Sequence, residues 1–504
     1  MMRLRLILVS LAATLTLGSL AATGGYAWYL RSDGYRGECA AALGRSLNLP
    51  SDIGRVVPLS RNARAFEDIR VWLPDRRALA HHVRTAVVSA VPTPTDPNAY
   101  EIMLSGGQTD ISNRTWLMGD YRRVVDASLR GGFLPNGPER VQFDDLSIAF
   151  ERDRFRLALQ HAAGLIDFAS PRIGVAEILC RRFNGVPCAE PALLTVEFEP
   201  NDGGIRINRL ELTLPRLPIS ATGIRDLLGI EGLSGDFNGH LKYGETGEGR
   251  WFEITGTCHA LDLAELTAGL LTRPWNGSFP TLELVEFSGR ANVPQRLRFR
   301  GQIRGLAPSE IAATWGLPEI GGQIDLTVAE ADLNGDGLSR LVASGVSSGL
   351  ELVAISGALG MGKASGHLRV QIDDLTIENN HLKSLDATIA VDEKDETPRW
   401  IEGALLKSLV DRAFQIQLPP MLPERIEYSR LGLRLEVRDE ILTIFGTHGP
   451  RENTILTVRL FGQEVPLIFE PKQSFDLKPW MAELRKSAVE NVRARAAQFP
   501  VRVQ

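Results

Sequence analysis

The sequence predicts a mainly β protein with short helices, in which an N-terminal transmembrane helix precedes a long antiparallel sheet and a C-terminal amphipathic helix. Three observations predict this fold: an uncharged N-terminal stretch, a two-residue period of apolar side chains after residue 141, and a recurring glycine-rich unit. With 44% hydrophobic and 23% charged residues, the 504-residue chain has the composition of an ordered protein.

The N-terminal stretch favours a membrane anchor. Two arginines precede residues 6–30, which carry no charge, and Trp28 and Tyr29 stand near the end of this segment. About 20 apolar residues span a bilayer, and aromatic residues are frequent at its interfaces. Because positive flanks stay in the cytoplasm, residues 1–5 are expected there and the remaining chain on the other side. A signal peptide cleaved near Ala21 is the alternative, and it also exports the chain.

Residues 31–140 are expected to form a mixed α/β region on the exported side. Residues 69–73 alternate as a strand does, whereas residues 74–90 place apolar side chains at helical spacing. Residues 113–129 form a second candidate helix. The sequence therefore predicts two helices before the repetitive sheet.

Residues 141–475 show the alternation of half-buried antiparallel strands, with one apolar face and one wet face. The apolar positions of four such strands are the candidate lining of a lipid-binding face: Leu194, Val196, Phe198, Leu297, Phe299, Leu368, Val370, Ile372, Leu433 and Leu435. In the sequence, a residue that contacts lipid and one in an ordinary sheet core look the same.

A glycine-punctuated unit occurs twice within this region. Residues 224–242 align with residues 311–328, so that Gly229 matches Gly316 and Gly235 matches Gly322. Each copy is typical of a short helix ended by glycine, a tight turn and a departing strand. Residues 261–271 match the same unit more weakly. Repeats of this kind predict stacking of similar units along one direction.

Residues 476–504 are expected to form a C-terminal amphipathic helix. Apolar side chains from Leu477 to Phe499 share one face opposite several lysines and arginines, Asp476 can cap the start, and Pro500 ends the pattern. This helix would pack on the end of the sheet, or else contact a membrane or close the end of a groove.

Cysteines and net charge limit the classes of partner. Cys180 and Cys188 flank an Asn-Gly turn that can bring them together as a disulfide, and the four cysteines lack the spacing of a metal site. No cofactor is expected. The net charge is −5 with no basic block, so no nucleic-acid partner is expected.

No catalytic constellation emerges, and the protein is not expected to be an enzyme. Residues 345–349 match the nucleophile-elbow pattern around Ser347, but residues 350–355 alternate as a strand where that motif requires a helix. Residues 357–364 resemble a phosphate loop, yet Ala364 stands where a hydroxyl residue is needed.

The uncharged N-terminal segment, the strand-then-proline stretch 66–74 and the units of the type 233–239 resemble the AsmA-like family of bacterial envelope proteins. The late strands up to Pro466 and the terminal helix resemble it too. This resemblance implies a long curled β-sheet with an apolar groove, held in the inner membrane by a single N-terminal span with the bulk of the chain in the periplasm. It also implies a role in phospholipid movement or outer-membrane maintenance.

Three functions are therefore compared. The first is an anchored groove that binds or transfers phospholipid or another acyl-chain lipid. The second is an envelope scaffold or assembly factor with a filled β-sandwich core and protein partners. The third and least favoured is an exported hydrolase.

Overall fold

The computed structural model describes residues 28–478 except 75–77, 93–98, 113–137, 153–154, 171–172, 202–203, 226–231, 248, 269–273, 291–292, 315–318, 336, 359–361, 393–394, 410–422, 461 and 472. Most of the expected anchor and the candidate helix at residues 113–129 lie outside these residues, as does the C-terminal helix beyond residue 478. Asp476 Oδ1 accepts a hydrogen bond from the Lys478 N–H (2.9 Å), the contact expected of a helix cap. Within the described part of the chain, no helix is both long and apolar enough to cross a bilayer.

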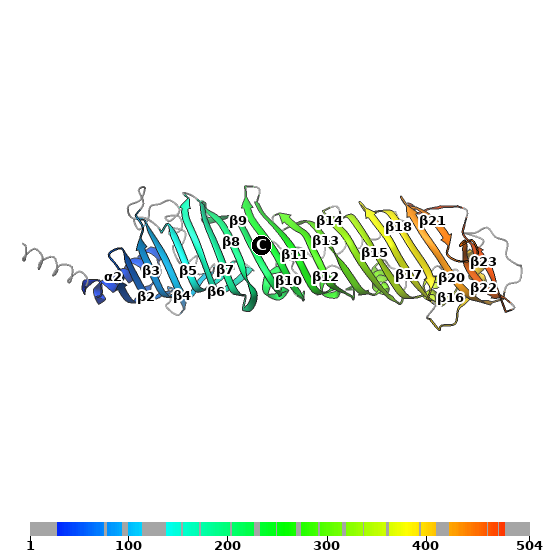
Figure 1. Ribbon diagram of the computed structural model, residues 1–504, viewed down its shortest axis with the longest axis horizontal. Helices are drawn as coiled ribbons and strands as arrows, with labels where there is room; N and C mark the ends of the chain where they lie inside the picture. The colour runs from blue at the N-terminus through cyan, green and yellow to red at the C-terminus, as the bar shows by residue number, and fades with distance from the viewer. Residues whose placement is uncertain are drawn as a thin grey trace, which may run out of the picture. The chain divides into compact units, whose positions relative to one another are not determined.

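The described chain is mainly β. Its 24 strands belong to one long sheet in which nearly all pairs are antiparallel, while β4 and β5 pair in parallel (Figure 1). This confirms the predicted mainly β fold with short helices. The chain divides into two compact units, the first dominated by Met1–Leu217 and the second by Glu253–Gln504.

The first unit is a run of strands that follow one another in chain order and begin beside one helix. Its elements are α2 (Asp33–Leu47), β1 (Ser51–Pro58), β2 (Ala63–Trp72), β3 (Leu79–Ala90), β4 (Tyr100–Ser112), β5 (Arg140–Arg152), β6 (Phe155–Ser170), β7 (Ile173–Phe183), β8 (Val186–Asn201) and β9 (Gly204–Pro218).

Helix α2 covers the beginning of this sheet. Ser32 caps it by accepting a hydrogen bond from the Tyr35 N–H (3.2 Å), and Asn48 ends it in the left-handed conformation. Ala40 of the helix packs on the buried Ile53 and Val56 of β1. The first strands therefore have a helical cover on one face, as a terminal unit of a stacked array needs.

The helix expected at residues 74–90 is wrong, because Leu79–Ala90 is strand β3, paired with β2 and β4. The buried side chains of this strand, Ala80, Val83 and Ala86, lie three residues apart, which imitates helical spacing. Three valines and one threonine lie in this segment, and β-branched residues favour the extended backbone between two neighbouring strands.

Residues 218–262, which are divided between the two units, contain α5 (Ile219–Thr222), β10 (Asp236–Thr246) and β11 (Gly249–Asp262). The second unit continues with α7 (Leu263–Ala268), β12 (Ser278–Arg290), β13 (Val293–Leu306), α8 (Pro308–Thr314), β14 (Gln323–Asn334), β15 (Gly337–Glu351), α9 (Leu352–Ala358), β16 (Ala364–Ser365), β17 (His367–Glu378), β18 (His381–Val391), β19 (Trp400–Glu402), α10 (Gly403–Leu409), β20 (Arg425–Arg438), β21 (Ile441–Gly446), β22 (Thr454–Leu460), β23 (Gln463–Phe469) and β24 (Phe475–Asp476).

A short helix follows every second strand from β9 to β15. Helices α5, α7, α8 and α9 begin at residues 219, 263, 308 and 352, which are 44 or 45 residues apart. Because neighbouring strands are antiparallel, every second strand ends at the same edge of the sheet. Within the second unit, α7, α8 and α9 each follow a strand that ends at this edge. A short helix, a turn and a departing strand therefore recur as expected, at half the spacing that the two clear copies indicate. Gly229 and Gly316, which were expected to end the helices, lie outside the described residues.

Each turn places a glycine before the departing strand. Gly322 has a φ of 114°, and a methyl group there would lie 2.7 Å from the Ser348 carbonyl oxygen. Gly235, Gly277 and Gly366 hold the equivalent places with positive φ. The carbonyl groups of these three accept a hydrogen bond from the first N–H of α5, α7 and α9 at 2.8, 3.0 and 3.0 Å. Helix α8 begins with Pro308, which has no N–H to donate.

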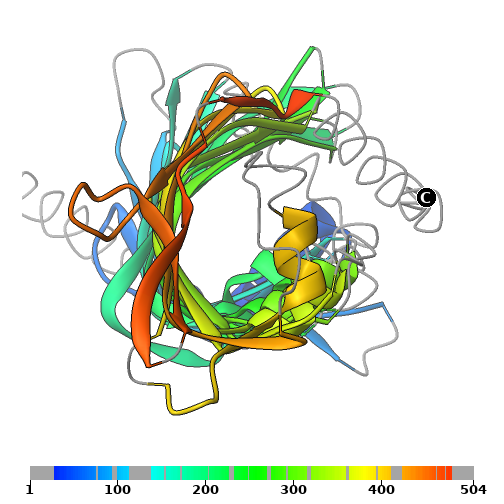
Figure 2. The ribbon, with the colours of Figure 1, turned by 90° about the vertical axis from the view of Figure 1, so that its right-hand side faces the viewer.

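The C-terminal part of the second unit contains a buried apolar cluster. Leu405 and Leu406 of α10 pack with Leu368 of β17, Val391 of β18 and Ile426 of β20. Within this unit, α10 lies on the concave side of the strands (Figure 2). Leu352 and Ile355 of α9 pack against the same cluster.

Candidate functional site

One face of the first unit carries an unbroken row of apolar residues across nine successive strands. Each member lies directly opposite the next in the strand register: Val56, Phe66, Ala86, Leu104, Phe143, Gly164, Ile178, Leu194 and Leu212. Because side chains alternate between the faces of a sheet, this register places all nine on one face. We call it the apolar face of the first unit.

The second unit has an apolar face of the same kind. One row across seven strands consists of Ile303, Leu326, Gly345, Ile372, Ala387, Leu435 and Ile444. A parallel row consists of Ile324, Ser347, Val370, Ile389, Leu433 and Gly446. Apolar surface therefore runs at right angles to the strands, and it continues from each strand to the next.

On this face, side chains in the row that contacts the short helices are more buried than those in the next row. Leu368 and Val391, which contact the helix-lined cluster, are 6% and 7% exposed. In the next row, Val370, Ile389 and Leu433 are only half-buried. Within the described chain, the short helices therefore cover the row nearest the strand ends and leave Val370, Ile389 and Leu433 partly in solvent.

The first unit shows the same gradient along β8. Leu194 is 7% exposed, whereas Val196 and Phe198 are half-buried. The Phe198 ring lies over Gly174 of β7, where any side chain would collide with it, and stands edge-on to Phe168 with 6.1 Å between ring centroids. Phe198 therefore covers the backbone of its neighbour and still presents apolar surface.

Register shifts in the second unit bend the strands at one level. They occur between Phe299 and Gly301, Val328 and Glu330, Ala343 and Gly345, and Ile372 and Asp374, in four successive strand pairs. A β-bulge bends its strand and increases the local twist. A column of bulges at one level therefore curves the sheet around its apolar face.

The opposite face of the second unit is charged, and its charges are paired across strands. Arg300 donates two hydrogen bonds to Glu283 at 2.7 Å each, and Arg296 donates to Asp332 at 3.1 and 2.7 Å. These hydrogen bonds from arginine lower the pKa of Glu283 and of Asp332. Acids and bases thus pair with one another on this face, while the other side of the same strands stays apolar.

The ten residues expected to line the lipid-binding face lie on the apolar faces of the two units. Val370 and Leu433 flank Ile389 in one row, and Ile372 and Leu435 flank Ala387 in the next. Phe299 stands opposite Leu284 and Ala331, and edge-on to Phe279. Leu194 and Leu368 are buried, and the other eight are half-buried: Val196, Phe198, Leu297, Phe299, Val370, Ile372, Leu433 and Leu435.

Several residues of these rows were missed in the sequence. Ile324, Leu326 and Val328 alternate clearly in β14, and this signal could have identified them. Leu375 belongs to the apolar face as well, but a bulge after Ile372 shifts the alternation in β17 by one residue, which hides it. Leu385 alternates with Ala387 and Ile389 in β18 without such a shift.

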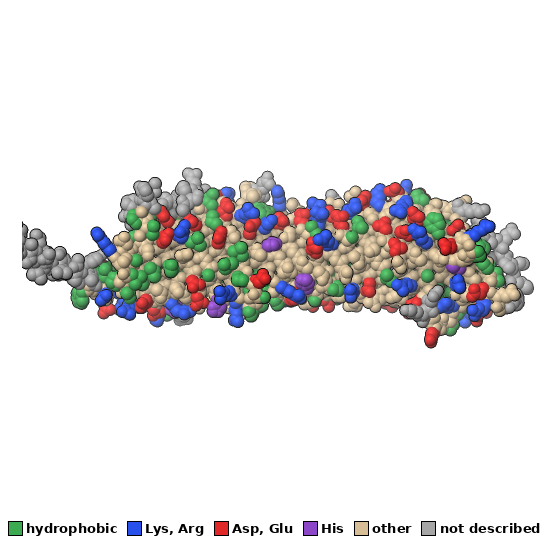
Figure 3. All heavy atoms as spheres, in the orientation of Figure 1, with side chains coloured by type: hydrophobic (Ala, Val, Ile, Leu, Met, Phe, Trp, Pro, Cys, Tyr) green, Lys and Arg blue, Asp and Glu red, His purple; other side chains and the backbone are tan. Residues whose placement is uncertain are grey.

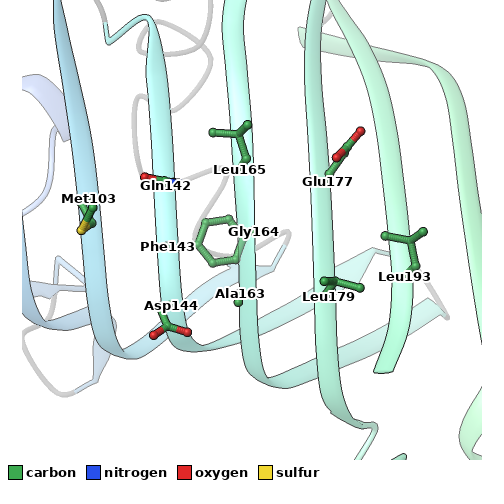
Figure 4. Close-up of a pocket in the computed structure, with 10 residues that line it drawn as sticks. All are labelled: Met103, Gln142, Phe143, Asp144, Ala163, Gly164, Leu165, Glu177, Leu179 and Leu193. Atoms are coloured by element: carbon green, nitrogen blue, oxygen red, sulfur yellow. The ribbon is translucent and has the colours of Figure 1, made fainter. Parts of the chain in front are cut away.

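A second apolar surface lies on the opposite face of the first unit. It surrounds a shallow pocket of about 450 Å³ (Figure 4), where Met103 is 52% and Leu179 is 49% exposed. Phe143 and Gly164, which belong to the row on the other face, also line this pocket. Figure 3 shows hydrophobic side chains gathered over β2 to β8, in contrast to the charged surface over β12 to β20. The side chains that define this patch are Met103, Leu165, Leu179, Leu193, Asp144 and Glu177.

Ser347, the candidate nucleophile, lies inside strand β15. It is 4% exposed, and its hydroxyl donates to the Gln323 carbonyl at 3.1 Å. The strand expected at residues 350–355 is wrong beyond Glu351, because α9 begins at Leu352. The serine is nevertheless five residues before this helix, away from the sharp strand-to-helix turn of a nucleophile elbow.

No family model, curated protein or solved structure matches this chain. The geometry of the rows is therefore the main evidence on function.

Proposed function

We propose that the protein binds acyl-chain lipid, most simply phospholipid, on the apolar faces of its sheet and passes it along the rows. The observation that supports this proposal is the unbroken row across seven strands of the second unit, whose large members are half-buried: Ile303, Leu326, Ile372, Leu435 and Ile444. Apolar surface left in water costs about 25 cal/mol per Å², and acyl chains gain about 0.8 kcal/mol per buried CH₂.

The dimensions of the rows suit lipid tails. Strands lie about 4.8 Å apart, so a row across seven strands is about 30 Å long. The hydrocarbon core of a bilayer, which holds two layers of tails, is also about 30 Å thick. One row therefore offers room for about two tails end to end, and its aliphatic side chains present no hydrogen-bonding group that would hold a tail in one place.

The proposal includes the cellular setting that the sequence indicates. An anchor at residues 6–30 would hold the protein in the inner membrane with the sheet in the periplasm, where phospholipid is delivered to maintain the outer membrane. The likeness to AsmA-like envelope proteins supports the same setting. The rows need no cofactor for this work.

Lipid content of the purified protein tests the proposal. The full chain is extracted in mild detergent, and bound phospholipid is measured by mass spectrometry. We expect phospholipid in the wild type, and we expect a rate of transfer between vesicles that is lower by about sixtyfold or more for Val370→Glu, because a carboxylate in hydrocarbon costs about 2.5 kcal/mol or more. Gln371→Glu adds the same charge on the opposite face and should leave transfer unchanged. A wild-type protein that carries no phospholipid and moves none would overturn the proposal.

The exposed patch of the first unit favours a second candidate function, an envelope assembly factor with protein partners. Exposed apolar residues rimmed by polar ones are typical of protein-binding surfaces. A photoreactive residue in place of Leu179 should then crosslink to one defined protein in cells, and Met103→Asp should abolish that product without changing lipid transfer. If crosslinking at Leu179 yields no discrete product, this second function fails.

A further inference from the structure

Cys180 and Cys188 face each other across the β7–β8 hairpin. Asn184 and Gly185 form its turn with φ values of 47° and 83°, the left-handed pair of a tight hairpin. Arg182 stands opposite Pro187, but Cys180 stands opposite Ala192, so residues 188–191 bulge out of the ladder beside Cys180. This irregularity places Cys188 next to the Cys180 side chain.

The two thiols have different surroundings. Cys180 is 1% exposed, and burial, followed by the neighbouring Cys188, raises its pKa to about 12. Cys188 is half-buried, with its sulfur 3.9 Å from the Val186 carbonyl oxygen. In the structure both are free thiols, as are Cys39 on α2 and Cys258 on β11. Cys188 is therefore the member of the pair that a reagent can reach.

The hairpin is held firmly in place. The Asn184 backbone N–H donates to the Ala158 carbonyl (2.7 Å), and its side-chain oxygen accepts from the Ala158 N–H (2.6 Å). Its side-chain nitrogen donates to the Ala221 carbonyl (2.7 Å). The turn between the two cysteines is therefore fixed to β6 and α5, and the Cys188 side chain neighbours that of Cys180.

We propose that Cys180 and Cys188 form an intrachain disulfide that closes the β7–β8 hairpin when the chain meets a disulfide-bearing oxidant. The Cys188 thiolate attacks one sulfur of the oxidant, and the other sulfur leaves as a thiolate. Cys180 then gives up its proton and attacks the Cys188 sulfur, which releases the second thiol of the oxidant. Two electrons and two protons pass from the cysteines to the oxidant, which ends as two thiols.

The bond would strengthen a weak point of the sheet. Ladder hydrogen bonds are lost where residues 188–191 bulge, and Cys180 belongs to a buried row on the apolar face with Ala162 and Ala192. A covalent link there restores the connection between β7 and β8 beside the rows. The inference does not depend on what the apolar face binds.

Peptide mapping tests the pair directly. Reduced full chain in mild detergent is treated with oxidised glutathione, blocked with N-ethylmaleimide in denaturant, digested and analysed by mass spectrometry. We expect a peptide that joins Cys180 to Cys188 and is lighter by two hydrogen atoms, with Cys39 and Cys258 alkylated. Cys258→Ser should leave the link intact, whereas Cys188→Ser should leave Cys180 alkylated.

Thermal unfolding tests the structural role. The oxidised wild type should unfold several degrees above the reduced wild type, and Cys188→Ser should show no such difference. Alkylation of both cysteines after oxidation, a glutathione adduct that stays on Cys188, or a link to Cys39 or Cys258 would each overturn the inference.

Discussion

Glycines at the repeat turns are fixed by their backbone conformation. At Gly322 the positive φ and the nearby Ser348 carbonyl oxygen both oppose a side chain. We expect Gly322→Ala to lower the free energy of unfolding by about 1–3 kcal/mol, measured by urea unfolding followed by circular dichroism. Gly335 lies in a hairpin turn with open space around it, so Gly335→Ala should change the free energy of unfolding by no more than about 0.5 kcal/mol. Equal effects at the two sites would contradict this account.

His81 of β3 is kept neutral by its surroundings. Its Nδ1 is hydrogen-bonded to the Thr109 hydroxyl on β4, and burial lowers its pKa to about 4. Because the unfolded chain binds a proton near pH 6.5 and the folded chain does not until about pH 4, stability falls as the pH falls through this window. The loss has an upper limit of about 3 kcal/mol.

Replacement of His81 should therefore flatten the pH dependence. We expect the apparent Tm of His81→Asn to fall less between pH 7 and pH 4.5 than that of the wild type. His240→Asn, at an exposed residue that bonds Thr213, should behave as the wild type does. If the His81 variant loses as many degrees as the wild type, protonation of this histidine does not govern acid stability.

Neighbouring repeats in the second unit are joined by acidic side chains of the short helices. Glu265 of α7 accepts a hydrogen bond from the Ser234 N–H (2.7 Å), just before Gly235, and Glu310 of α8 accepts in the same way from Asn276, just before Gly277. Each carboxylate thus satisfies a turn of the preceding repeat. The stability of stacked repeats depends on the interaction energy between neighbouring repeats, and this contact contributes to it.

Loss of one such contact should weaken the array locally. We expect Glu265→Ala to reduce stability by about 1–2 kcal/mol, and to increase hydrogen exchange of the Ser234 amide most strongly. Glu253→Ala in β11 tests for a general effect of removing an acid and should leave that amide protected. Unchanged exchange at Ser234 in Glu265→Ala would show that the carboxylate is dispensable.

The sequence predicts elements well where the local pattern and the neighbours agree. Leu194, Val196 and Phe198 alternate without an extra residue in β8, since the bulge opposite Phe198 lies in β9, and their strand was found with its apolar face. Residues 350–355 alternate too, but α9 begins at Leu352, where the first N–H bonds to the Gly366 carbonyl from a later strand. That partner is 14 residues away, so a local pattern cannot reveal it.

At the scale of the whole molecule, the spacing of the repeats was harder to predict than their nature. The clear copies at residues 224–242 and 311–328 are two repeats apart. The repeat between them, at α7, keeps only its helix and Gly277 and is therefore hard to recognise in the sequence. The candidate rows were predictable as a set of apolar positions. Their register was not, because it depends on bulges that alternation does not show.

Burial divides the ten lining residues into two classes, and this division leads to a last prediction. Val370 and Leu433 are half-buried, whereas Leu368 is covered by the cluster that contains α10. A photoreactive group modifies the residues that it touches. A phospholipid with such a group on its tail should therefore label the half-buried lining residues and leave the buried ones unlabelled. The labelled peptides are mapped by mass spectrometry, and a lipid with the reactive group on its headgroup serves as the control. Labelling of Leu368 as strong as that of Val370 would mean that lipid enters by opening the helical cover, and labelling confined to the charged face would exclude the apolar rows as the binding surface.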